Sequence, residues 1–131
     1  MPIIWLDIYD THIDLVDEQH RILVDMINDL ETAKGKENEC KLIGELFFNL
    51  VDYTRYHFAQ EEELMKKIKY PKINEQINQH KAFVSQILET LQTIKKGNVS
   101  EKMDMFLTNW LIKHILGYDY ELGKYYNIVT R

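Results

Sequence analysis

Apolar residues recur three and four positions apart along four long stretches of the chain, which is the periodicity of amphipathic helices. These stretches cover residues 17–34, 39–69, 73–96 and 100–116. Glycine and proline, which interrupt helices, are sparse at 5 Gly and 2 Pro. The pattern predicts an all-α fold in which residues 1–16 form an extended N-terminal arm.

The connections between these stretches are too short to cross over the bundle. Consecutive helices are therefore expected to be antiparallel neighbours in an up-down-up-down four-helix bundle. Asp17 is a candidate N-cap for the first helix, and Pro71 is expected to end the second, because the residue before a proline disfavours helical angles. Gly117 is expected to loosen or end the fourth helix near Leu116.

Composition places the chain among ordinary globular domains. It has 131 residues, 45% of them hydrophobic, and a formal net charge of -5 from 21 acidic and 16 basic residues. The dispersed acidic excess argues against nucleic acid or an anionic membrane as partner. The single Cys40 cannot form an internal disulfide, and no apolar run is long enough to span a bilayer. We expect one domain over residues 1–131, monomeric and cytoplasmic.

Each of the four predicted helices carries one histidine on its apolar face. Counting along the helices to the connecting loops places these histidines and Glu61 near one level of the bundle, since antiparallel helices rise equally per residue. The histidines are His20, His57, His80 and His114. A single such histidine is typical of a hydrogen-bonded core residue, but four at one level with a carboxylate indicate a shared role.

A metal site accounts for this cluster, because a buried carboxylate without a partner is costly. His57 and Glu61 are four residues apart and so share a helix face. Asp119 follows His114 by five, so the two residues share a face only across a π-type turn or a break at Gly117. Mixed imidazole and carboxylate ligands favour iron or manganese over structural zinc.

The sequence resembles the hemerythrins, and in particular the single-domain bacterial ones, over nearly its whole length. The family motif is H, HxxxE, HxxxH and HxxxxD on four successive helices, and here it reads His20, His57 with Glu61, Gln76 with His80, and His114 with Asp119. The resemblance implies a domain that holds two iron ions with a bridging oxo or hydroxo group and binds O2 reversibly.

The resemblance also implies a role for each matching residue. His20 and His57 would hold the iron with the open O2 position, Glu61 and Asp119 would bridge both irons, and the second iron would take His80 and His114. The sequence departs from the family at Gln76, where the second iron loses a histidine; Gln76 would coordinate through its carbonyl oxygen or leave the position to water. The residues that match the apolar O2 pocket of the family are Leu23, Phe58, Trp110, Leu111 and Ile115.

Three functions follow from this pattern. The first is an O2 carrier, store or scavenger, which is not an enzyme. The second is a di-iron redox enzyme or sensor that acts on O2, peroxide or nitric oxide because the second iron lacks one histidine; Tyr53 would then be a candidate proton or electron donor. The third is a bundle that has lost its metal and serves as an interaction module, a hypothesis that predicts more than one lost ligand. His12 in the arm is a conceivable replacement ligand, although its position is more typical of a surface residue.

Overall fold

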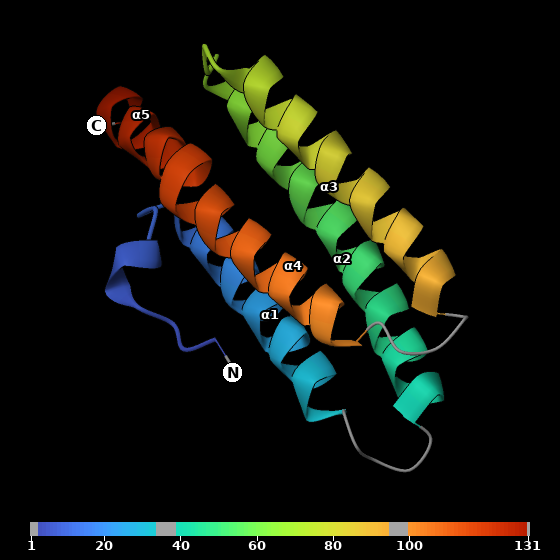
Figure 1. Cartoon of the computed structure of the whole chain (residues 1–131). Helices are drawn as coiled ribbons and strands as arrows, with labels where there is room; N and C mark the ends of the chain where they lie inside the picture. Colours follow the sequence, from blue (N-terminus) through green and yellow to red (C-terminus); the bar gives the residue numbers. More distant parts are fainter. Residues whose placement is uncertain (1–2, 34–38, 95–99, 131) are drawn as a thin grey trace.

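The structure is a computed structural model that describes residues 3–33, 39–94 and 100–130. All regular secondary structure in these residues is helical, without a strand. The elements are the 3-10 turn η1 (Asp7–Tyr9), α1 (Asp14–Thr32), α2 (Glu39–Lys67), α3 (Ile73–Ile94), α4 (Ser100–His114), the π-helical turn η2 (Ile115–Asp119) and α5 (Tyr120–Val129). Helices α1 to α4 lie side by side along one axis (Figure 1), which confirms the predicted four-helix bundle.

The N-terminal arm is shorter than predicted. Helix α1 begins at Asp14, so Asp17 lies inside the helix and is not its N-cap. The Asp17 carboxylate instead accepts hydrogen bonds from the backbone N–H and the hydroxyl of Thr11, each at 2.8 Å, and from the N–H of His12 at 3.1 Å. The side chain thus ties the preceding loop to the first turns of α1. The predicted helix ends at residues 34 and 96 lie outside the described residues.

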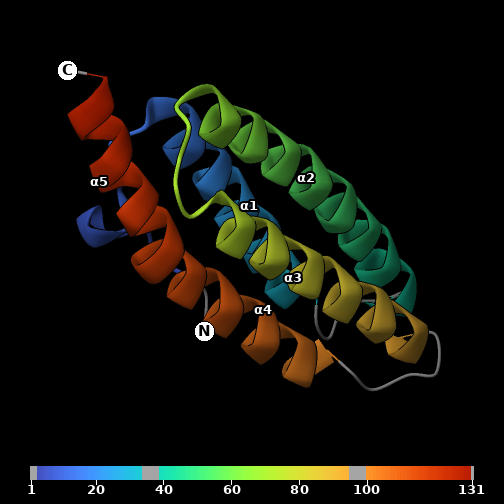
Figure 2. The same cartoon turned by 90° about the horizontal axis from the view of Figure 1, so that it is seen from above.

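The fourth predicted helix does not end near Leu116. It widens into η2, which contains Gly117, and then continues as α5 to Val129. Figure 2 shows α5 extending the line of α4 beside the N-terminal segment. A Cβ on Gly123 would collide with the carbonyl oxygen of Thr11, and the Asn127 amide donates to the same oxygen at 3.3 Å. The extension is held by this close backbone approach, which the helical periodicity before Gly117 does not reveal.

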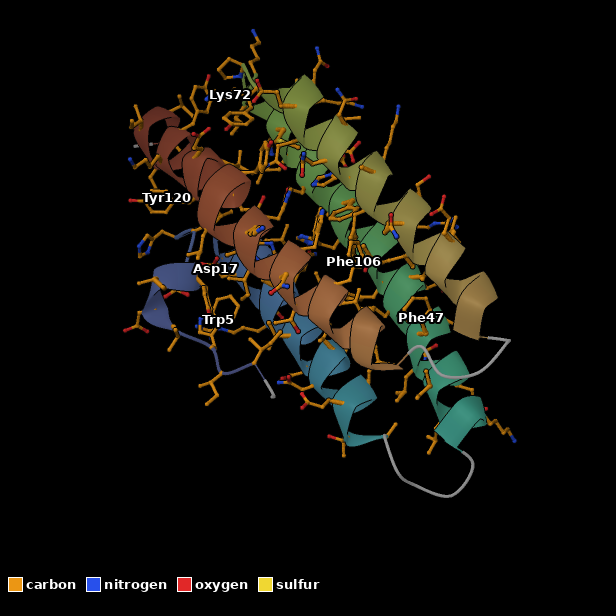
Figure 3. All side chains as sticks on the ribbon, viewed as in Figure 1. Trp5, Asp17, Phe47, Lys72, Phe106 and Tyr120 are labelled. Carbon is orange, nitrogen blue, oxygen red and sulfur yellow. The ribbon has the colours of Figure 1, made fainter. Side chains whose placement is uncertain are left out.

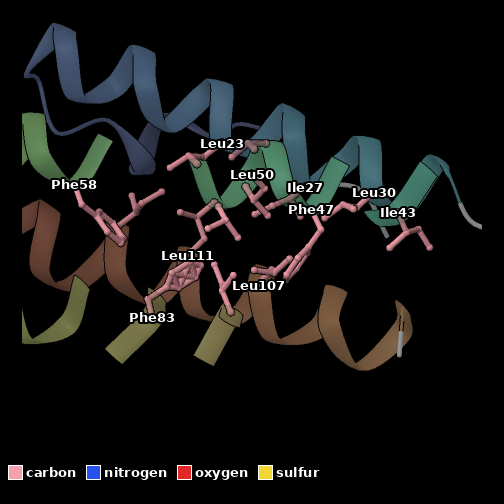
Figure 4. Packing of buried hydrophobic residues seen from close by; sticks show 14 of the residues in the cluster. Leu23, Ile27, Leu30, Ile43, Phe47, Leu50, Phe58, Phe83, Leu107 and Leu111 are labelled. Carbon is pink, nitrogen blue, oxygen red and sulfur yellow. The ribbon is translucent and has the colours of Figure 1, made fainter. Parts of the chain in front are cut away.

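Two apolar clusters fill the interior and leave a polar layer between them. The larger cluster runs from Phe58 toward Ile43 along the bundle (Figure 4) and includes Leu23, Ile27, Leu30, Phe47, Leu50, Phe83, Leu107 and Leu111. The smaller cluster comprises Ile13, Val16, Met65, Tyr70 and Leu122. On α1 the smaller cluster ends at Val16 and the larger begins at Leu23; on α2 the larger ends at Phe58 and the smaller begins at Met65. The polar layer lies between them, at His20 and Glu61.

The N-terminal segment packs along α1. Ile3 exchanges two hydrogen bonds with the Asn28 amide, at 2.7 and 2.9 Å. The Trp5 indole donates to Asp10 at 3.1 Å and lies 5.0 Å below the Arg21 guanidinium, in the region labelled in Figure 3. In the described part of the chain, none of the helices combines the length and the apolar character that crossing a membrane requires.

Candidate metal centre

Seven polar side chains from all four bundle helices and η2 converge in the buried layer. They are His20 on α1, His57 and Glu61 on α2, Gln76 and His80 on α3, His114 on α4 and Asp119 in η2. Each is between 0% and 3% exposed. The level predicted by counting residues from the loops is therefore the level at which these side chains meet.

The Glu61 carboxylate lies between imidazoles that come from different helices. Its Oε2 is 3.3 Å from Nε2 of His57 and 3.9 Å from Nε2 of His20. Its Oε1 is 3.2 Å from Nε2 of His80. One oxygen thus faces the imidazoles of α1 and α2, and the other faces α3.

The Asp119 carboxylate has the same arrangement. Its Oδ2 is 3.0 Å from Nε2 of His20, and its Oδ1 is 3.2 Å from Nε2 of His114. The Gln76 amide nitrogen donates to Oδ1 at 3.0 Å. Five residues separate Asp119 from His114, and η2 supplies the π-type turn that brings both onto one face.

Two partners outside the layer fix the orientation of one imidazole each. Nδ1 of His57 lies 2.6 Å from Oε1 of Gln19, and Nδ1 of His80 lies 2.9 Å from Oε2 of Glu62. Both oxygens accept, so each Nδ1 carries the proton, and Nε2 of the neutral ring keeps a lone pair directed inward. The sequence analysis did not identify either partner. The signal was their position, directly beside His20 and Glu61 in the chain.

The carboxylates and imidazoles shift one another's pKa values. Burial pulls the pKa of His20 and His80 down, but the carboxylates around them raise both above the ordinary value. At His57 the effect of burial exceeds that of the nearby carboxylates, so its pKa is lowered. Burial also opposes ionisation of Glu61 and Asp119, yet the imidazoles lower the pKa of Glu61, and that of Asp119 to well below its usual range. The layer therefore holds carboxylates that are anionic although fully buried.

The inward atoms of the layer fit a pair of cations. Neutral His80 directs a lone pair at a carboxylate oxygen 3.2 Å away, a contact that repels unless a proton or a cation lies between. Hydrogen bonds are missing at eight buried atoms of the layer: both oxygens of Glu61, Oδ2 of Asp119, Oε1 of Gln76, Nε2 of His80, Nδ1 of His20, and both ring nitrogens of His114. His20 and His57 group with Glu61 as one possible metal site, and His80 and His114 group with Glu61 as another. Because Glu61 belongs to both, the donor set suits two adjacent metals that share a carboxylate.

A small enclosed cavity adjoins the His20 and His57 side of the layer. Its volume is ≈ 10 Å³, about the space of one water molecule. Its lining combines His20, His57 and His114 with Leu23, Ile27, Leu50, Thr54, Phe58, Phe83, Trp110 and Leu111. Four of the five predicted O2-pocket residues are in this lining; the fifth, Ile115, is buried in η2 beside His114 but is not part of it.

Aromatic rings brace the imidazoles around this cavity. Phe58 stacks on His80 with ring centroids 3.8 Å apart, and Trp110 stacks on His114 at 4.5 Å. Both rings fix the imidazole planes as well as covering the site. Thr54, one turn before His57, is a cavity residue that the sequence analysis did not identify.

Other candidates lie outside the layer. His12 is exposed, as its position in the arm suggested, so it does not replace the missing histidine. Tyr53 is half-buried and packs against the larger apolar cluster, and it is not among the described residues that line the cavity.

This bundle, with two carboxylates shared among four buried imidazoles, defines a non-haem metal protein. The Hemerythrin HHE cation binding domain model matches residues 11–126, and the chain belongs to the hemerythrin family, which is known for di-iron O2 binding. It is 34% identical over 118 residues to a bacteriohemerythrin of Stenotrophomonas maltophilia, covering 89% of this chain and 76% of that protein. It is 31% identical over 120 residues to a myohemerythrin of Theromyzon tessulatum, covering 92% and 90%. A crystal structure of a hemerythrin mutant matches with a TM-score of 0.85 and 25% identity, covering 95% of this chain and 97% of that one.

Proposed function

We propose that this protein binds O2 reversibly at a non-haem di-iron centre and acts as an oxygen carrier, store or scavenger. One observation carries the proposal: Glu61 and Asp119 each direct one oxygen toward one set of imidazoles and the other oxygen toward a second set. That is the arrangement needed to bridge two metals. An O2-binding role agrees with the hemerythrin family, whose members generally bind O2 without being enzymes.

In this proposal His20 and His57 would hold one iron, and His80 and His114 would hold the other. Glu61 and Asp119 would each offer an oxygen to both irons, and an oxo or hydroxo group would complete the centre. Two ferrous ions bring four positive charges, and two carboxylates and a hydroxide neutralise most of them without another buried anion. When bound, the iron pair supplies the electrons that O2 binding requires.

The cavity residues keep water away from the O2 position. Leu23, Phe58 and Leu111 are buried and line the cavity beside His20 and His57. A dry, apolar wall of this kind would exclude water from the site. The small volume of the cavity excludes a large substrate.

Gln76 takes the position of the missing histidine with a neutral amide. Its amide nitrogen holds Asp119, while its carbonyl oxygen is buried and has no hydrogen-bond partner. The carbonyl oxygen is therefore free to ligate the second iron, or to bind a water molecule that does so. A neutral oxygen donor is less basic than an imidazole, so we expect weaker retention of the second iron than in a site with three imidazoles.

The visible spectrum of anaerobically iron-loaded protein tests this function. We expect absorption bands that appear on exposure to O2 and vanish when the sample is flushed with argon. A Glu61→Gln variant treated in the same way is the control and should give no bands. Protein that takes up no iron during reconstitution would contradict both the proposed function and its alternative.

The alternative is a di-iron redox enzyme or sensor that acts on O2, peroxide or nitric oxide. Gln76 favours it, because a coordination position without an imidazole is more readily given up to a second ligand. Irreversible oxidation of the iron pair by O2, together with sustained consumption of peroxide or nitric oxide, would support the alternative over reversible O2 binding.

A further inference from the structure

Thr54 is a fully buried residue whose hydroxyl has no hydrogen-bond partner. It is 1% exposed, lies on α2 one turn before His57, and lines the cavity beside the metal layer. A threonine within a helix commonly donates to the carbonyl four residues earlier. Thr32 and Thr130 do so in this chain, donating to Asn28 at 3.0 Å and to Tyr126 at 2.7 Å. Thr54 makes no such bond.

No described side chain around Thr54 forms a hydrogen bond with its hydroxyl. The cavity lining combines the imidazoles of His20, His57 and His114 with hydrocarbon side chains such as Leu50 and Ile27. Among the described lining residues, Thr54 is the one that contributes a hydroxyl. A buried donor without a partner is destabilising, and it becomes satisfied when an acceptor enters the cavity.

We propose that the Thr54 hydroxyl donates a hydrogen bond to the small ligand that occupies this cavity, and so selects ligands with an acceptor atom. The inference rests on the proposed function, because the cavity adjoins His20 and His57 at the assigned O2 position. The apolar wall sets the size of the ligand, and Thr54 adds a preference for a small ligand with a charged or polar acceptor atom, such as azide. Thr54 is thus a ligand-binding residue that does not touch the metal.

Azide titration of the iron-loaded, oxidised protein tests the inference. Thr54→Val keeps the shape of the side chain but removes the hydroxyl, and we expect it to weaken azide binding about tenfold. Thr54→Ser restores the hydroxyl and should recover most of the wild-type affinity. Thr32→Val is the matched control, because it removes an exposed helix hydroxyl far from the cavity, and it should leave azide binding unchanged.

The melting temperature of the metal-free variants gives a second measurement that needs no ligand. Because the hydroxyl has no hydrogen-bond partner within the protein, Thr54→Val should raise the melting temperature by about 3 °C. An unchanged or lower melting temperature would contradict the inference, since the hydroxyl would already have a partner. Equal azide affinity in Thr54→Val and the wild type would also overturn it. Failure of the proposed function would appear separately, as wild-type protein without iron, while the melting comparison would still report on the hydroxyl.

Discussion

The two halves of the polar layer orient an imidazole with different kinds of hydrogen-bond partner. The first half is the pair His20 and His57; the second half is Gln76, His80 and His114. In each half one imidazole is held through Nδ1 by a side chain outside the layer. The first half uses the neutral Gln19, at 2.6 Å, whereas the second half uses the carboxylate of Glu62, at 2.9 Å.

We infer from this difference that Glu62, outside the layer, compensates for the weaker ligand Gln76 inside it. A carboxylate hydrogen-bonded to Nδ1 makes the imidazole a more basic ligand than a neutral amide does. The half that contains Gln76 therefore holds His80 with the stronger partner. The first half holds His57 with a neutral partner, which places less charge beside the cavity.

Removing the Glu61 carboxylate should have the largest effect on iron binding, because this group faces the imidazoles of both halves. Glu61→Gln keeps the size of the side chain but removes the charge that faces both sets of imidazoles. We expect the iron content after ferrous reconstitution to fall from about two per chain to well below one. The exposed neighbour Glu63→Gln is the charge-matched control and should load normally. Full iron loading of Glu61→Gln would exclude a carboxylate bridge at this position.

Removing the outer partners should act on one half at a time. Glu62→Ala and Gln19→Ala each free one imidazole, and loss of such a partner typically costs 10–100-fold in metal affinity. We expect the larger loss from Glu62→Ala, because its hydrogen bond is charge-assisted. Iron retention against a graded chelator measures both losses, with Glu63→Ala as control. If Gln19→Ala lost iron more readily than Glu62→Ala, the proposed compensation would be wrong.

Placing an imidazole at position 76 in the second half should have a smaller effect, and it should strengthen iron binding. Gln76→His supplies the third histidine of the family motif, and we expect about tenfold tighter retention of the second iron, equivalent to about 1.4 kcal/mol. Gln79→His adds an imidazole to the same helix one residue before His80 and serves as control. The same chelator competition measures the gain. A variant that binds iron no better than the wild type would mean that the Gln76 oxygen is already an equivalent ligand.

The sequence predicts the parts of this comparison that depend on helical periodicity. His20, His57, Glu61 and His80 lie at one level because antiparallel helices rise equally, and residue counts along the chain are enough to predict that level. Asp119 could be placed only conditionally, since its five-residue spacing needs a local π turn. Gln19, Glu62 and Thr54 were missed because their roles depend on which neighbour lies across the helix interface. The continuation of the fourth helix through α5 was missed because Gly123 and the Thr11 backbone meet only in the folded chain.

The smallest effect is the pH dependence of the metal-free protein, which separates His57 of the first half from His80 of the second. The pKa of His80 is raised above 6.5, so its stabilising contribution is fully present below pH 6.5 and is lost as the pH rises through the folded-state value. The pKa of His57 is lowered, so its contribution is present above pH 6.5 and is lost as the pH falls through the folded-state value. His80→Gln should therefore cost more stability at about pH 5.5 than at about pH 8, whereas His57→Gln should cost more at about pH 8. Urea unfolding midpoints of the metal-free variants at both pH values measure the two trends. Parallel trends in the two variants would contradict the opposite pKa shifts of His57 and His80.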